Sequence, residues 1–297
     1  MKKALLGFAC LVLMASCSTL NIVDQNAAMN AGAAAIQALT ISDAQIAQVC
    51  TEYMAQMDNS NNIAPANSEY SQRLTRIMGR FKNISSLNLN YKVYQSNTVN
   101  AFASGDGSVR VYTGLMDVMN DDELFAVIGH ELGHLINKDV RDAYRTAYLV
   151  VAARYGIAAV SQTAGALSTG FLGDLGQELA SAAYSRRQET EADETAFQFC
   201  VQNGVDPFAM YHALNVLISL NSDTGQQGTL TEMFASHPDT QKRATHVREI
   251  AEAAGYSLRD SSNNSSVSNT NTNTNTNTNT NTNTKPKVKL PKNTKKN

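Results

Sequence analysis

The chain has 297 residues, of which 43% are hydrophobic and 17% are charged, and its net charge is −2. This length and apolar content support one large domain with a sizeable core, or two small domains. The nearly balanced charge gives no reason to expect a nucleic-acid partner.

The N-terminus has the pattern of an export signal. Lys2 and Lys3 precede an apolar run, from Ala4 to Met14, that is too short to span a membrane as a stable helix. The run ends in LMASC, which resembles the lipobox of bacterial lipoproteins and implies cleavage before Cys17 and lipidation of its thiol. Ser18 is not the aspartate that marks retention in the inner membrane. We therefore expect an outer-membrane lipoprotein that faces the periplasm, with an unlipidated secreted protein as the alternative.

Helical periodicity begins soon after the expected tether over residues 17–26. Apolar residues at helical spacing predict helices over 27–57 and 68–82. The composition of residues 58–67, which include Pro65, predicts a loop between the two helices.

A small sheet is predicted next. Apolar and polar residues alternate from Leu87 to Val93, which predicts a half-buried strand. Two further strands, Val99 to Ala103 and Ser108 to Tyr112, flank a hairpin-like turn at residues 105–107. The expected fold class is therefore mainly α with a small β-sheet (α+β).

His130, Glu131 and His134 form the pattern H-E-x-x-H inside a predicted helix, for which Asn120 offers an N-cap. Residues four apart lie on one helix face, so both imidazoles reach one metal ion. In this pattern two histidines bind zinc and the glutamate acts as general base. A chance match on a buried helix is the alternative, but Glu131 would be costly to bury without a partner. The sequence therefore predicts a metal site.

Residues 141–185 are rich in alanine and glycine. The run from Ala147 to Leu167 has the length of a membrane span, but Arg154 interrupts it, so packed helices are preferred to membrane contact. Residues 165–176 are predicted to form a flexible loop that could act as a lid.

Three helices are predicted in the C-terminal half. The first runs from Glu178 to about Val201, the second begins at Pro207, and the last extends from His237-Pro238 to about Ala254. Cys50 and Cys200 remain after processing, either as one disulfide or as two buried thiols.

The third zinc ligand must come from elsewhere, because a peptidase zinc takes three protein ligands and leaves one position open. No third histidine follows His134 at metzincin spacing, so a carboxylate on a later helix is expected. Glu189 to Asp193 read E-x-x-x-D and end in Ala-Asp. With this second motif the chain resembles the HtpX/Oma1-like zinc metallopeptidases of the minigluzincin type. The resemblance implies Glu189 as third ligand and Asp193 as the residue that orients His130; Glu191 is the competing ligand.

The resemblance covers roughly residues 70–250 and implies a zincin-like fold. It includes Asn100, Ala101 and Phe102, which in the family form a strand beside the cleft where substrate binds in extended form. It also includes His237 in a Ser-His-Pro motif. The resemblance implies that His237 either polarises the developing oxyanion, as a catalytic residue, or occupies the open zinc position as a plug.

After residue 258 the sequence consists largely of polar residues, with Asn-Thr repeats followed by a basic C-terminal segment. Residues 259–297 are predicted to be disordered, because such a sequence cannot bury a core. A solvated tail is preferred to one that contacts anionic lipid or peptidoglycan. The expected organisation is thus a signal peptide over 1–16, a tether over 17–26, a peptidase domain over 27–258 and this tail.

The expected function is that of a membrane-anchored periplasmic endopeptidase, with one Zn²⁺ per chain, that cleaves misfolded or stalled envelope proteins. Its expected partners are protein substrates, the membrane through the lipid on Cys17, and envelope assembly partners, but no nucleic acid. The alternative is a chaperone-like binding or assembly factor that uses the same fold with little turnover. The intact Glu131 argues against this alternative, because a structural zinc needs no general base.

Overall fold

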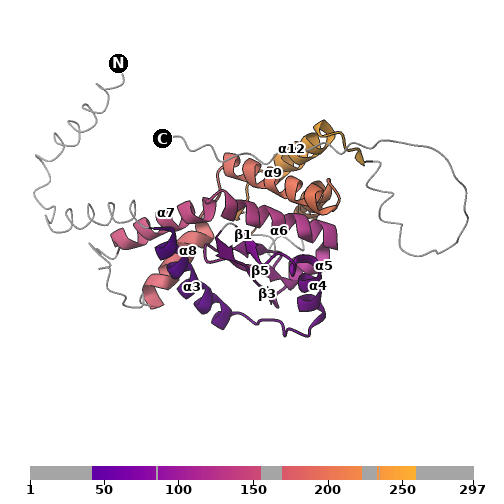
Figure 1. The fold of residues 1–297 in the computed structure, drawn as a ribbon. Coiled ribbons are helices and arrows are strands. Elements are labelled where there is room, and N and C mark those ends of the chain that lie inside the picture. Colours follow the sequence, from indigo (N-terminus) through magenta and orange to yellow (C-terminus); the bar gives the residue numbers. More distant parts are fainter. Residues whose placement is uncertain (1–41, 85, 155–168, 223–232, 234, 259–297) are drawn as a thin grey trace, which may run out of the picture.

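The computed structural model describes residues 42–84, 86–154, 169–222, 233 and 235–258 (Figure 1). The predicted signal peptide, the tether, Cys17, the start of the first helix and the tail lie outside these residues. The helices are α3 (Asp43–Ser60), α4 (Glu69–Met78), α5 (Thr113–Val118), α6 (Asp121–Ile136), α7 (Asp139–Arg154), α8 (Thr169–Ser181), α9 (Arg186–Asn203), α10 (Ala209–Ser222) and α12 (Thr240–Ala253). The strands are β1 (Asn83–Ile84), β2 (Leu87–Asn88), β3 (Asn90–Tyr94), β4 (Ala101–Ala103) and β5 (Ser108–Tyr112). The predicted α+β class is confirmed.

The main sheet has three strands in the order β3-β5-β4. β5 is parallel to β3 and antiparallel to β4, so the predicted hairpin is confirmed. The strand predicted from Leu87 to Val93 is divided, because β2 pairs with β1 in a separate two-stranded sheet. β3 and β4 are the two edge strands of the main sheet in the described part of the chain.

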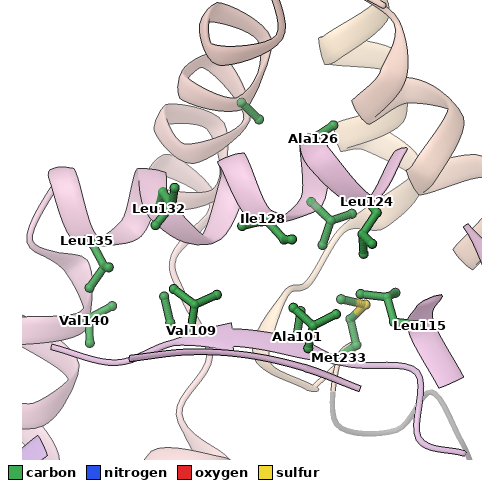
Figure 2. Packing of buried hydrophobic residues seen from close by; sticks show 14 of the residues in the cluster. Ala101, Val109, Leu115, Leu124, Ala126, Ile128, Leu132, Leu135, Val140 and Met233 are labelled. Atoms are coloured by element: carbon green, nitrogen blue, oxygen red, sulfur yellow. The ribbon is translucent and has the colours of Figure 1, made fainter. Parts of the chain in front are cut away.

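Helix α6 lies between the main sheet and α9 (Figure 1). Asn120 and Glu123 form a reciprocal capping box at its N-terminus, and every residue from Leu124 to Leu135 is buried. Figure 2 shows Ala101 and Val109 projecting from the sheet toward this helix. A helix buried on all sides is held by packing rather than by its intrinsic propensity.

The opposite side of α6 approaches α9 closely. A Cβ atom on Gly133 would lie 3.0 Å from the Cα atom of Ala192, so glycine permits this approach. The two motifs predicted from the sequence therefore lie on adjacent helices. Within the described residues, no helix combines the length and apolar character needed to cross a membrane.

The loop predicted over residues 58–67 begins later, because α3 continues through Ser60. The side chain of Asp58 explains the extra turn: its carboxylate accepts hydrogen bonds from Arg110 at 2.8 and 3.0 Å and from Tyr94 at 2.7 Å. Burial would raise the pKa of Asp58, but hydrogen bonds from Arg110, Lys92 and Tyr94 outweigh it and lower this pKa to about 2. The end of α3 is thus anchored on the sheet by a charged contact.

Three other predicted boundaries are wrong. The helix predicted from Glu178 to Val201 is broken, because α8 ends at Ser181 and α9 begins at Arg186 behind a capping box formed by Ser185 and Gln188. The loop predicted over 165–176 is helical from residue 169, and its first residues lie outside the described part. The helix predicted over 68–82 ends at Met78, before Gly79. Cys50 and Cys200 are both buried and free, which contradicts the disulfide alternative.

Candidate metal centre

Four buried side chains present their donor atoms to one point: His130 and His134 from α6, Glu189 from α9, and His237 from the segment before α12. The Nε2 atoms of the two α6 histidines are 3.1 Å apart. Oε1 of Glu189 lies 3.5 Å from Nε2 of His134 and 3.0 Å from Nδ1 of His237. Nδ1 of His237 is 3.3 Å from Nε2 of His130. These residues come from three regions that are distant in sequence.

The spacing of these donors fits a tetrahedral metal ion. With metal–ligand bonds of about 2.0–2.1 Å, neighbouring ligand atoms of a tetrahedral zinc site lie about 3.3 Å apart. The four donor–donor separations given above, between 3.0 and 3.5 Å, lie around this value. His130, His134 and Glu189 are the three donors predicted to bind zinc. His237 lies where a catalytic zinc site keeps its open position.

The charges around the cluster also favour a cation. Glu131 is 3% exposed, and within the described part of the chain its Oε1 atom has no hydrogen-bond partner. This atom lies 3.5 Å from Nε2 of His237. Burial would lower the pKa of His134, but Asp139 and Glu189 raise it to about 9. The carboxylates around His134 therefore favour a positive charge at that ring, whereas burial and the charge of Arg243 lower the pKa of His130.

A carboxylate contacts the Nδ1 atom of each α6 histidine, on the side of the ring away from the donor cluster. Nδ1 of His130 lies 2.9 Å from Oδ1 of Asp193, and Nδ1 of His134 lies 2.9 Å from Oδ2 of Asp139. In each pair the ring nitrogen donates to the carboxylate, which leaves Nε2 free to bind a metal. Gln188 donates to the other oxygen of Asp139 at 3.0 Å. Asp193 thus lies where the second motif predicts it, whereas Asp139 was missed.

Arg243 from α12 is buried next to the donor cluster. It donates to both oxygens of Asp193, at 2.9 and 2.7 Å, and forms an ion pair with Glu189. Burial would raise the pKa of Asp193, but the charge and hydrogen bonds of Arg243 lower it to about 2. Arg243 therefore keeps Asp193 ionised and contacts both carboxylates. No role for this arginine was predicted from the sequence.

Glu191, the competing ligand, lies away from the cluster. Its side chain is 41% exposed and pairs with Arg187 at 2.9 Å, whereas the side chain of Glu189 is 1% exposed. The two glutamates are two positions apart on α9, so they point to different faces. The geometry favours Glu189.

A cleft of about 530 Å³ opens beside the cluster. Glu131, His237 and Tyr184 line it, together with residues of β4, α3 and α8. Among the described residues that line the cleft, Glu131 is the one acidic side chain, and the rest are apolar, aromatic or uncharged polar groups or His237. The cleft thus suits a chain segment with few charges.

Tyr184, between α8 and α9, was also missed by the sequence analysis. Its ring stacks on the imidazole of His134, with centroids 3.8 Å apart and an interplanar angle of 12°. Burial and the nearby carboxylates of Glu131, Asp139 and Glu189 raise the pKa of its phenol. The hydroxyl therefore stays protonated and remains a hydrogen-bond donor.

Among the described residues, the edge strand β4 has backbone groups without a partner strand on the side of the cleft. The amide of Tyr112 donates to the carbonyl of Asn100 at 3.0 Å, and the amide of Ser104 donates to that of Ser108 at 2.8 Å. Because hydrogen-bonded and non-hydrogen-bonded pairs alternate in an antiparallel ladder, Ala101 and Ala103 direct their N–H and C=O groups to the free edge. Of the predicted residues Asn100, Ala101 and Phe102, Ala101 has this orientation.

Comparison with known proteins identifies peptidases that are similar to this chain. The profile described as Peptidase family M48 matches residues 65–251. Metalloprotease LoiP of Escherichia coli (strain K12) is 39% identical over 234 residues, which are 78% of this chain and 91% of LoiP. Metalloprotease YcaL of the same strain is 38% identical over 238 residues, covering 80% of this chain and 92% of YcaL. Mitochondrial metalloendopeptidase OMA1 of Schizosaccharomyces pombe is 29% identical over 203 residues, covering 68% of this chain and 57% of OMA1.

Proposed function

Because this chain is a metalloprotease that belongs to peptidase family M48, we propose that it is a zinc endopeptidase acting on unfolded segments of cell-envelope proteins. One observation carries the proposal: the buried carboxylate of Glu131 lies beside a four-donor cluster and lines a cleft with a free strand edge. The fit of His130, His134 and Glu189 to tetrahedral separations supports zinc as the metal.

Bound zinc would polarise the scissile carbonyl and acidify the attacking water. Glu131 then acts as general base, because its Oε1 atom accepts no hydrogen bond in the described part of the chain. It accepts the proton of the water as the C–O bond forms, and it returns that proton to the leaving amine nitrogen as the C–N bond breaks. Asp193 and Asp139 keep the two histidine rings oriented throughout.

The substrate binds along the free edge of β4. Backbone groups of Ala101 and Ala103 bond to an extended peptide, which adds a strand to the sheet. A folded protein keeps its strands paired internally, so unfolded segments are the natural occupants. The largely uncharged walls of the cleft suit the apolar residues that such segments expose.

The proposed location is the periplasmic face of the outer membrane, through a lipid on Cys17. This proposal rests on the basic and apolar N-terminal pattern and on the lipobox resemblance. In that place the enzyme meets envelope proteins that have stalled during export or assembly, which gives it a role in protein quality control and access to envelope assembly partners.

The experiment that tests the proposed activity is digestion of an unfolded model protein by the purified full-length chain. We expect internal cleavage that stops when a chelator removes the metal and returns when zinc is added back. Activity that persists after complete metal removal would contradict a zinc mechanism. The products should be identified by mass spectrometry, since release of single terminal residues would indicate an exopeptidase instead.

His237 is proposed to hold the resting enzyme closed, because its Nδ1 atom lies among the predicted zinc ligands. We expect His237→Ala to raise kcat/KM about tenfold, since activity scales with the fraction of molecules in the competent state. The variant should also lose zinc to a chelator faster, because one donor is gone. The measurement is initial-rate kinetics together with zinc release. A fall in kcat would instead assign His237 to stabilisation of the oxyanion.

A further inference from the structure

Tyr184 is held beside the donor cluster by two separate contacts. Its ring stacks on His134 with centroids 3.8 Å apart, and it lies 5.4 Å from the ring of His237. Its backbone amide donates a hydrogen bond to the carbonyl oxygen of Ser236 at 3.1 Å. Ser236 directly precedes His237, the fourth donor of the cluster. Both contacts fix where the phenol lies, so the position of Tyr184 does not depend on its hydroxyl.

The hydroxyl of Tyr184 is the second feature, because it makes no hydrogen bond to any described residue. Among the described residues, the structure gives the Tyr184 hydroxyl no hydrogen bond, whereas Tyr94 and Tyr144 bond to Asp58 and Ser104. A tyrosine hydroxyl usually finds a partner where the ring is largely covered. The Tyr184 side chain lines the cleft together with Glu131 and His237, so the unused donor belongs to the wall that a substrate would contact.

We propose that Tyr184 is a further catalytic residue, whose hydroxyl donates a hydrogen bond to the carbonyl oxygen of the scissile peptide bond as that oxygen gains negative charge. This proposal rests on the proposed function. A donor held in place before the reaction stabilises the developing charge without reorganisation. The ring stacked on His134 supplies that fixed position.

Two substitutions separate the role of the hydroxyl from that of the stacked ring. Tyr184→Phe keeps the ring and removes only the donor, so we expect kcat to fall about 100-fold with KM changed less than twofold. Its rate of zinc loss to a chromogenic chelator should match that of the parent chain. Tyr184→Ala removes the stack as well, and it should also release zinc faster.

A phosphinic peptide with apolar side chains provides a readout that does not depend on turnover. Its tetrahedral phosphinate mimics the developing oxyanion, so Tyr184→Phe should weaken its binding by a factor similar to the fall in kcat. Tyr91→Phe is the matched control, because the Tyr91 hydroxyl likewise has no hydrogen-bond partner among the described residues but lies on β3, away from the lining of the cleft. That variant should match the parent chain in all three measurements.

Parent-like kcat and phosphinate affinity in Tyr184→Phe would overturn the assignment. So would faster zinc loss in Tyr184→Phe that accounts for its lower activity, because the hydroxyl would then act on the metal site. If the parent chain did not hydrolyse proteins, the proposed function would fail, while phosphinate binding by the zinc-loaded chain would still decide the role of Tyr184.

Discussion

Replacing Glu131 with glutamine should lower kcat about 10³-fold while zinc stays bound. Glutamine has nearly the same shape as glutamate, but its amide cannot accept the proton of the attacking water. Glu131 is not among the residues whose donor atoms form the cluster, so the metal site should remain intact. Rates of protein hydrolysis and zinc content, measured on the same preparations of full-length chain, would separate loss of the base from loss of the metal.

The matched control is Glu191→Gln, which removes an exposed carboxylate from α9 and should leave the rate unchanged. The cellular test uses the same pair of variants. If Glu131→Gln lost hydrolysis but kept the biological activity of the chain, the protein would act as a binding or assembly factor, and the peptidase account of its role would be wrong.

Replacing Glu189 with alanine should weaken zinc binding by more than about 100-fold, the loss expected from removal of a merely supporting residue. Glu189 supplies the one carboxylate oxygen among the clustered donors, at 3.0 Å from Nδ1 of His237 and 3.5 Å from Nε2 of His134. Its removal also deprives the buried Arg243 of one of its two acidic partners. Hydrolysis should fall with the bound metal.

Zinc affinity in this series is best measured by competition with a chromogenic chelator. Glu189→Gln is the companion variant: it preserves the volume of the side chain, so weaker zinc binding there cannot be attributed to a cavity. Glu191→Ala should bind zinc as the parent chain does. Loss of zinc in Glu191→Ala with retention in Glu189→Ala would show that the second motif is aligned two residues out of place.

The part of the site that could be predicted from sequence is the part that local geometry determines. His130 and His134 are one helical turn apart, so their convergence follows from the helix itself. Glu189 lies on a different helix, and no local rule places it beside α6. The resemblance to a family supplied it, and its 1% exposure together with the exposed position of Glu191 agrees with that assignment.

The residues that were missed depend on chain reversals. Asp139 reaches His134 because Lys138 adopts a left-handed conformation, with φ of 67°, between α6 and α7. Tyr184 reaches His134 because the chain breaks between α8 and α9, where a single long helix was predicted. The signal for that break was present in Ser185 and Gln188, which have the spacing of a capping box. Asp58 was assigned to a loop from the composition of residues 58–67, since its contact with Arg110, which is distant in sequence, leaves no local signal.

The most direct test of the account is an anomalous difference map, from crystals of the full-length chain, recorded on both sides of the zinc absorption edge. We expect one zinc peak per chain, at about 2.0–2.1 Å from Nε2 of His130, Nε2 of His134 and a carboxylate oxygen of Glu189. A zinc-loaded chain without a peak between these residues, or with its zinc bound elsewhere, would contradict the central claim.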